Sequence, residues 1–289
     1  MFEGAYTAIV TPFNADGSVD YGKLKSLIET QVEAGIDGIV PMGTTGESPT
    51  LDFEEHERVI GVAIEASRGR IKVIAGTGAN STAEALRLSK HALKAGADGT
   101  LQVTPYYNKP NQEGLIRHFS AVADLGLPVV LYNIPSRTGR EIAVETVAKL
   151  ARHPKIVVIK EASGSVDRVS QILRMCEITV LSGDDPLTLP MMAVGAKGVI
   201  SVASNLVPGP VAAMVHYALE GEWKNARALH MKYHRLFSDI FLDTNPIPIK
   251  AAMAMAGMIK EVYRLPLCEM SVPLRQRLAE CLKELGIVR

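Results

Sequence analysis

The sequence predicts a closed barrel of eight parallel strands alternating with helices, a (β/α)8 or TIM barrel, followed by a C-terminal helical appendage. Short apolar, largely β-branched runs recur eight times between residues 6 and 204, and segments of helical periodicity separate them. Parallel strands need crossover connections that are normally helices, so this alternation is typical of such a barrel. The chain has 289 residues and is 47% hydrophobic, which is enough for one large domain with a small appendage.

The predicted strand runs end in Gly, Thr, Pro or Asn and cover 6–13, 38–46, 71–78, 99–108, 128–135, 156–163, 178–185 and 197–204. The predicted helices between and after them cover 21–34, 53–66, 83–95, 112–124, 144–151, 166–175, 186–194 and 208–220. Glycines suited to a helix C-cap end several of these helices, at Gly35, Gly96, Gly195 and Gly221. Ser81 and Glu84 have the spacing of a capping box before the helix at 83–95.

The pattern changes near residue 223, which divides the chain into a barrel over 1–222 and a helical domain over 223–289. Three helical segments without a strand between them follow, at 223–241, 249–258 and 272–285. A doubly wound open sheet is the alternative for the first part. It leads us to expect a glycine-rich nucleotide turn after the first strand, where the sequence has Thr11-Pro12-Phe13.

Composition excludes several functional classes. Lysine plus arginine and aspartate plus glutamate number 31 each, so no excess charge points to nucleic acid or a membrane surface. No signal peptide and no uncharged apolar run long enough to span a bilayer is recognisable. Cys176, Cys268 and Cys281 are odd in number and widely spaced, as expected of reduced thiols in a cytoplasmic protein.

The chemistry of a TIM barrel lies at the carboxyl ends of its strands, and here those ends are rich in hydroxyl groups. They carry one lysine, Lys160, and no histidine, which argues against a metal site; we therefore expect no metal and no cofactor. His230 and His234 are spaced i, i+4 but lie in the appendage, where a solvated helix face explains them better. No GxxxxGK phosphate loop is present.

Lys160 ends the run Ile156–Ile159, which reads as a strand buried on both faces. Burial disfavours the charged form of an amine, and a neutral lysine can form a Schiff base with a carbonyl. A lysine that caps the strand and extends to water is the alternative. Schiff-base chemistry needs proton carriers, for which the phenols of Tyr132 and Tyr107, with Thr44 between them, are the candidates.

Six segments together carry a family resemblance that runs over nearly the whole chain. They are GTTGE at 43, VTPYYNKP at 103, YNIPSRTG at 132, IKEASG at 159, LSGDD at 181 and GVISV at 198, with NPIPIK at 245 in addition. In this order they resemble the dihydrodipicolinate synthase family. The resemblance implies a lyase that condenses pyruvate with L-aspartate-4-semialdehyde, the first committed step towards diaminopimelate and lysine.

Carried over by motif, the resemblance implies that Lys160 forms the Schiff base and that Tyr132 donates and accepts protons. Thr44 would link Tyr132 to a Tyr107 supplied by a neighbouring subunit of a homotetramer built from two dimers. For pyruvate, it implies that Thr45 holds the carboxylate and that Ile200 lies beside the bound molecule. It implies that Arg137, whose planar guanidinium suits an oxyanion, holds the semialdehyde carboxylate. Gly183 would contribute backbone near the site.

The resemblance also implies an L-lysine inhibitor site at the interface. Its positions match Ser48, Pro49, Phe53, His56, Asn80, Glu84 and Tyr106, of which Pro49 and Phe53 depart from the commonest family pattern. Two other functions stay open. Related pyruvate-dependent lyases of N-acetylneuraminate or 2-keto-3-deoxy sugar acids share the lysine and the YNIP tyrosine, and a non-catalytic barrel could bind a keto acid without turnover.

Overall fold

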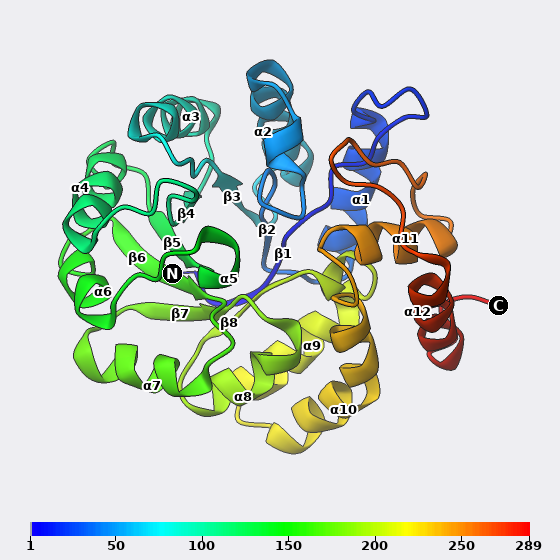
Figure 1. Cartoon of the computed structure of the whole chain (residues 1–289). Helices are drawn as coiled ribbons and strands as arrows, with labels where there is room; N and C mark the ends of the chain where they lie inside the picture. The colour runs from blue at the N-terminus through cyan, green and yellow to red at the C-terminus, as the bar shows by residue number, and fades with distance from the viewer. Residues whose placement is uncertain (1) are drawn as a thin grey trace.

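The structure, a computed structural model that describes residues 2–289, is a closed barrel in which each strand pairs in parallel with the next and β8 pairs with β1. Figure 1 looks along the barrel, with the helices forming an outer ring. The strands are β1 (Gly4–Thr7), β2 (Gly38–Ile39), β3 (Lys72–Gly76), β4 (Gly99–Val103), β5 (Val129–Asn133), β6 (Ile156–Glu161), β7 (Thr179–Ser182) and β8 (Gly198–Ser201). The predicted TIM barrel is confirmed.

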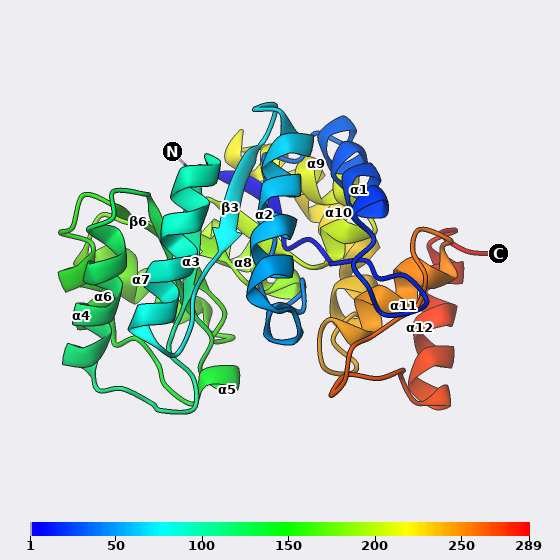
Figure 2. The ribbon, with the colours of Figure 1, turned by 90° about the horizontal axis from the view of Figure 1, so that it is seen from above.

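The helices of the outer ring follow the strands in chain order. They are α1 (Tyr21–Glu33), α2 (Phe53–Ser67), α3 (Thr82–Ala95), α4 (Gln112–Ala123), α6 (Val144–Leu150), α7 (Val166–Met175), α8 (Thr188–Ala193) and α9 (Pro208–Leu219). The short α5 (Pro135–Thr138) and the 3-10 turns at Ser48–Thr50 and Ala203–Asn205 occupy loops for which the sequence predicted no helix. A further 3-10 turn at Asp185–Leu187 overlaps the start of the helix predicted over 186–194. Figure 2 shows α5 at the end of the barrel opposite the N-terminus.

The predicted strand runs are longer than the observed strands because the chain leaves the sheet soon after its apolar core residues. The run at 38–46 contains a strand of two residues, and the following residues form turns at the barrel mouth. Regular pairing ends there, so the hydroxyl-bearing residues after each strand lie in loops. In a TIM barrel these loops build the active site.

Two apolar clusters hold the barrel. The smaller one fills the barrel interior with side chains from seven of the eight strands, among them Tyr6, Val130, Val158, Leu181 and Ile200, and with Val40 directly after β2. The larger one lies between the sheet and the helices. Alternation along each strand sends successive side chains to these two layers, which is why residues with interior neighbours are followed by residues that face the helices.

Helix N-termini are capped by side chains at several loops that reach the barrel mouth. Asp52 and Glu55 form a capping box at the start of α2, and Asn111 caps α4. The box predicted from Ser81 and Glu84 at α3 is wrong, because the Ser81 side chain makes no capping hydrogen bond. The Glu84 side chain instead lines a cavity that also contains Tyr106.

Three helices follow the barrel, namely α10 (Trp223–Asp239), α11 (Ile247–Met255) and α12 (Val272–Glu284). Figures 1 and 2 both place α11 near α1, with α12 beyond α11, on the side of the barrel away from α4 and α6. The start of α11 approaches the barrel mouth, where Lys250 and Glu47 form an ion pair and both side chains are fully buried. Within residues 2–289, no helix combines the length and apolar character needed to cross a membrane.

Candidate active site

A cavity of about 220 Å³ opens among the carboxyl ends of the strands. Six of the eight residues predicted for catalysis or substrate binding line it: Thr44, Thr45, Tyr132, Arg137, Lys160 and Gly183. These residues come from loops or strand ends up to 139 residues apart in sequence and meet only because the barrel closes. The remaining lining includes Asp184, Val202 and two residues from the C-terminal segment, Phe241 and Asn245.

Lys160 lies inside the barrel mouth with 5% of its surface exposed. It pairs with Tyr132 in the register of β5 and β6, and its Nζ atom lies 4.2 Å from the centroid of the Tyr132 ring. Gly183 leaves the space that the lysine occupies. A Cβ atom at Gly183 would lie 2.8 Å from Lys160 Cε, closer than side chains approach. The amine therefore reaches the cavity along a channel bounded by an aromatic ring and a glycine.

The residues that follow Tyr132 and Lys160 in their strands form a buried polar network on the helix side of the sheet. Asn133 Nδ2 donates to both carboxylate oxygens of Glu161, at 3.0 and 3.1 Å, and Arg168 Nε donates to Glu161 at 2.9 Å. The side-chain oxygen of Asn133, Oδ1, accepts from the backbone N–H of Ile142 at 3.0 Å. These contacts fix the ends of β5 and β6 next to each other. Their alternation with Tyr132 and Lys160 is the sequence signal that could have identified them.

The turn that carries Thr44 and Thr45 is held from both sides. Glu47 ends it with φ of 56°, a left-handed conformation that is unusual for a residue other than glycine. Its buried carboxylate pairs with Lys250, and Thr11 donates to the Gly46 carbonyl oxygen at 2.6 Å. Burial lowers the pKa of Lys250, while the Glu47 charge acts in the opposite direction. Strain of this kind persists where surrounding contacts fix the backbone, as they do here.

Arg137 and Thr45 meet the same residue of the C-terminal segment. The Arg137 guanidinium donates to the backbone carbonyl oxygen of Asn245 at 2.9 Å, and the Asn245 side-chain amide donates to the Thr45 hydroxyl at 3.0 Å. Asn245 belongs to the NPIPIK stretch, but no feature of that stretch indicates a function for it. Its position depends on α11 packing at the barrel mouth, which local sequence does not reveal.

Two adjacent aspartates follow β7 and differ in their surroundings. Asp184 lines the cavity; burial raises the pKa of its carboxyl group, and the positive charge of Lys160 partly offsets that rise. Asp185 is fully buried and accepts hydrogen bonds from the Ser201 hydroxyl and from the backbone N–H groups of Val202 and Ala203. Burial raises the pKa of Asp185 to about 6, although these hydrogen bonds oppose the rise.

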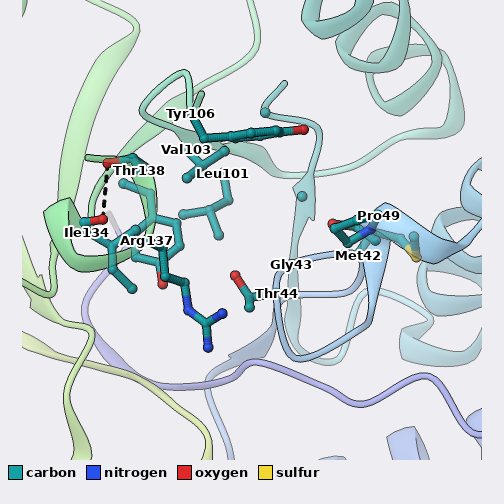
Figure 3. Close-up of a pocket in the computed structure, with 14 residues that line it drawn as sticks. Met42, Gly43, Thr44, Pro49, Leu101, Val103, Tyr106, Ile134, Arg137 and Thr138 are labelled. Atoms are coloured by element: carbon teal, nitrogen blue, oxygen red, sulfur yellow. Dashed lines mark hydrogen bonds between the residues drawn. The ribbon is translucent and has the colours of Figure 1, made fainter. Parts of the chain in front are cut away.

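A second cavity, of about 210 Å³, adjoins the first and shares Thr44, Tyr132 and Arg137 with it. In Figure 3 the Thr44 hydroxyl and the Arg137 guanidinium project into this space, and the Tyr106 ring bounds one side. Its other walls are mainly apolar, including Leu101 and Val103. The first cavity thus extends toward the loop that carries Tyr106 and Tyr107.

Two predicted residues lie outside both cavities. Tyr107 is 91% exposed, with φ of 71°, and is not among the lining residues of the cavity that contains Lys160. Ile200 is fully buried in the barrel interior, and the cavity lining from the end of β8 is Val202. A single chain therefore brings together one of the two phenols with Thr44 and Lys160.

A third cavity, of about 400 Å³, contains six of the seven residues predicted for a lysine site: Ser48, Pro49, Phe53, His56, Glu84 and Tyr106. Asn80 is not among its lining residues; its backbone carbonyl oxygen accepts from the Asn108 side chain at 2.9 Å. Burial lowers the pKa of His56 to about 4, and burial together with the nearby Glu84 charge raises the pKa of Tyr106. Ser48, Pro49 and Tyr106 also line the second cavity.

The side chains of residues 2–289 include no group of three or more His, Cys, Asp or Glu that could hold a metal ion. The arrangement at Lys160 instead offers one buried amine, a phenol, hydroxyl groups and a guanidinium around a small cavity. Such groups suit a small carbonyl compound that carries a carboxylate.

Comparison with known proteins gives concordant results. The Dihydrodipicolinate synthetase family matches residues 1–285. The 4-hydroxy-tetrahydrodipicolinate synthase of Syntrophus aciditrophicus is 53% identical over 291 residues, covering 100% of both chains. That of Persephonella marina is 52% identical over 294 residues, again covering 100% of both.

Solved structures agree with these sequence matches. Dihydrodipicolinate synthase from Aquifex aeolicus has a TM-score of 0.97 and 52% identity over 99% of each chain. The enzyme from Acinetobacter baumannii, solved in complex with pyruvate, has a TM-score of 0.98 and 43% identity over 100% of each chain. The enzyme from Cyanidioschyzon merolae, solved with lysine bound, has a TM-score of 0.96 and 42% identity over 99% of each chain.

Proposed function

Because this chain belongs to the dihydrodipicolinate synthetase family, we propose that it condenses pyruvate with L-aspartate-4-semialdehyde to give 4-hydroxy-tetrahydrodipicolinate. The observation that carries the proposal is the buried Lys160 amine, 4.2 Å from the Tyr132 ring centroid in a cavity at the barrel mouth. The pyruvate complex of the Acinetobacter baumannii relative supports pyruvate as the first substrate.

Lys160 is the nucleophile in this proposal. Its neutral amine attacks the keto carbon of pyruvate, water leaves, and a protonated imine remains on Nζ. The imine withdraws electrons from the neighbouring methyl carbon, which loses a proton to give an enamine. The enamine carbon then bonds to the aldehyde carbon of the semialdehyde, whose oxygen takes up a proton. Attack of the semialdehyde's own amino group on the imine carbon closes a ring and releases Lys160.

Proton transfer in these steps is assigned to Tyr132, Thr44 and a Tyr107 from a neighbouring subunit. Tyr132 and Thr44 line the cavity with Lys160, which supports their part. Tyr107 is exposed and held in a left-handed conformation, both of which are expected of an aromatic side chain that inserts into another copy. The second cavity offers the space between Thr44 and Tyr106 for it. We accordingly propose a homotetramer made of two dimers.

If each subunit supplies its Tyr107 to the site of its neighbour, two inactive variants should complement each other. Lys160→Ala and Tyr107→Phe chains are each impaired alone. A mixed dimer contains one site with both native residues, so activity recovers when the two variants are unfolded and refolded together. Separately refolded variants, mixed without subunit exchange, are the control. Sedimentation velocity measures the oligomer in parallel, and a fully active monomer would contradict the assignment.

Substrate binding is assigned to four further residues. Thr45 and Ile200 border pyruvate, with Thr45 holding its carboxylate; Arg137 holds the semialdehyde carboxylate; and Gly183 gives space and backbone next to Lys160. Thr45, Arg137 and Gly183 all line the cavity, which supports their roles. Ile200 lies one layer deeper in the barrel. It acts as the apolar floor below Val202 rather than as a direct polar contact.

Turnover with defined substrates tests this function. Purified protein supplied with pyruvate and L-aspartate-4-semialdehyde forms product, whereas cleavage of N-acetylneuraminate or 2-keto-3-deoxygluconate is negligible. Arg137→Ala lowers kcat/KM for the semialdehyde by about 100-fold, since a bidentate charge-assisted contact is lost, and Arg137→Lys recovers only part of it. Preference for a sugar acid would identify the related lyase, and absence of turnover on every substrate would identify a keto-acid-binding protein.

We also propose that L-lysine binds the third cavity and inhibits. The lysine-bound Cyanidioschyzon merolae structure supports this class of ligand, and Glu84 supplies a carboxylate for an ammonium group. Shared lining by Ser48, Pro49 and Tyr106 gives a physical route from this cavity toward Thr44. Calorimetry with millimolar L-lysine gives heat that Glu84→Gln abolishes. Glu113→Gln, on the exposed side of α4, is the matched control and leaves the heat unchanged. No heat with the native chain would contradict the proposal.

A further inference from the structure

Asn245 connects the two residues that the proposed function assigns to the two substrate carboxylates. It comes from the segment that precedes α11, outside the barrel, yet lines the cavity with Lys160. Its side-chain amide donates to Thr45 Oγ1 at 3.0 Å, and its backbone carbonyl oxygen accepts from Arg137 at 2.9 Å. Asn245 is 7% exposed and Thr45 is 2% exposed, so water does not compete freely for these contacts.

The contact with Asn245 determines what the Thr45 hydroxyl can do. A hydroxyl group has one proton to donate and two lone pairs that accept. Because the Asn245 amide occupies a lone pair, the hydroxyl proton is left to donate. Within residues 2–289 it meets no protein acceptor, and Thr45 faces the cavity. A carboxylate offers acceptors only, so a hydroxyl fixed as a donor is complementary to it.

We infer that Asn245 is a positioning residue that fixes the Thr45 hydroxyl as a donor to the carboxylate of the keto acid. The inference rests on the proposed function, since it needs a keto acid bound beside Lys160. In the reverse arrangement Thr45 would donate to Asn245 Oδ1 and present lone pairs to an anion. The donor contact of Asn245 therefore favours a group that accepts a hydrogen bond, such as a carboxylate, at this end of the cavity.

The side-chain oxygen and the backbone carbonyl oxygen of Asn245 distinguish a positioning role from a purely structural one. Its Oδ1 atom is buried and accepts no hydrogen bond among the described residues. An unpartnered buried acceptor destabilises a protein, which a contact serving stability alone would avoid. The contact with Arg137 uses the backbone carbonyl oxygen, which every substitution at position 245 retains. Side-chain replacement thus disturbs Thr45 and leaves the Arg137 contact in place.

The test is Asn245→Ala, measured separately with each substrate. In a double-displacement reaction kcat/KM for each substrate is independent of the other. We expect kcat/KM for pyruvate to fall about fivefold, as for the loss of one hydrogen bond, while kcat/KM for L-aspartate-4-semialdehyde changes less than about twofold. The pyruvate concentration that gives half-maximal borohydride trapping rises by the same factor. General distortion of the site would lower both values together.

Thr45 variants show whether Asn245 acts through the hydroxyl. In a Thr45→Ser background the hydroxyl remains, and Asn245→Ala again lowers kcat/KM for pyruvate about fivefold. In a Thr45→Val background the hydroxyl is absent, and Asn245→Ala lowers kcat/KM for pyruvate no further. Asn245→Asp, which has the same shape but no donor at neutral pH, is the second variant if Asn245→Ala fails to fold. An undiminished effect in the Thr45→Val background, or equal losses for both substrates, overturns the inference. A native chain that forms no pyruvate adduct overturns the proposed function as well, and so distinguishes the two failures.

Discussion

Gly183→Ala is the substitution whose effect follows most directly from the geometry of the site. The added Cβ would lie 2.8 Å from Lys160 Cε, 3.1 Å from Lys160 Cγ and 2.7 Å from the Cβ of Ala162. Gly183 does not have a left-handed φ, so the backbone conformation itself accepts alanine. Only the missing space opposes the change, and because Ala162 blocks the other side, the lysine has to move.

The size of that movement sets the expected loss of rate. Ordinary contact begins near 3.4 Å, so Lys160 Cε has to retreat by about 0.6 Å. A misplacement on the order of 1 Å in a reacting group costs about 100-fold in rate. We therefore expect the rate of imine formation to fall about 10- to 100-fold, which raises the barrier by about 1.4–2.7 kcal/mol.

Single-turnover borohydride trapping with excess pyruvate measures this rate directly. Gly61→Ala is the matched control, since its Cβ meets nothing within 4 Å in α2. It should trap at the native rate and be more stable by about 0.5–1 kcal/mol, because alanine favours a helix over glycine. A Gly183→Ala chain that traps pyruvate at the native rate would refute the assignment of Gly183 as the residue that makes room for the lysine.

Three further predictions concern the buried charges around the site. Lys250→Met leaves Glu47 charged and unpaired in the interior, so the free energy of unfolding in urea should fall by about 3–5 kcal/mol; a change below about 1 kcal/mol contradicts the buried pair. Glu161→Gln retains the size of the side chain but weakens the bonds that join β5 to β6, and should lower kcat about tenfold with little change in fold by circular dichroism; an unchanged kcat would show that Lys160 does not depend on them. Since burial raises the pKa of Asp185 from 3.8 to about 6, the folded state binds more protons than the unfolded state between these values, and stability relative to Asp185→Asn should fall as pH rises from about 4 to about 6 and then level off. Parallel unfolding curves for the two chains over that range would show that Asp185 does not titrate as stated.

The sequence predicted the barrel because its signals are local. Buried parallel strands read as apolar runs such as Ile156–Ile159, and their alternation with amphipathic segments leaves few topologies. Once the fold was predicted, the ends of the runs placed Thr44, Tyr132 and Lys160 at one mouth, and in the structure all three line one cavity. Local signals do not predict the detailed contacts of loops. Ser81 and Glu84 have the spacing of a capping box, but the Ser81 side chain makes no capping hydrogen bond.

Contacts between distant segments could not be predicted in this way. The Glu47–Lys250 pair and the Asn245–Thr45 hydrogen bond join residues 203 and 200 positions apart. All four residues lie in the GTTGE and NPIPIK segments, but nothing in the local sequence indicates that these two segments meet. The position of Glu161 could have been predicted in part, because strand alternation after Lys160 directs this carboxylate toward the helices. There it forms an ion pair with Arg168. Tyr107 is exposed in the single chain, and the role proposed for it needs a second chain, whose contacts the sequence of one chain does not indicate.

Mass analysis of the protein after borohydride reduction in the presence of pyruvate shows directly whether Lys160 forms a Schiff base. We expect one irreversible adduct per chain, located on the peptide that contains Lys160, and its loss in Lys160→Ala. An adduct on another lysine, or the same adduct yield in Lys160→Ala, would contradict a Schiff base at the barrel mouth.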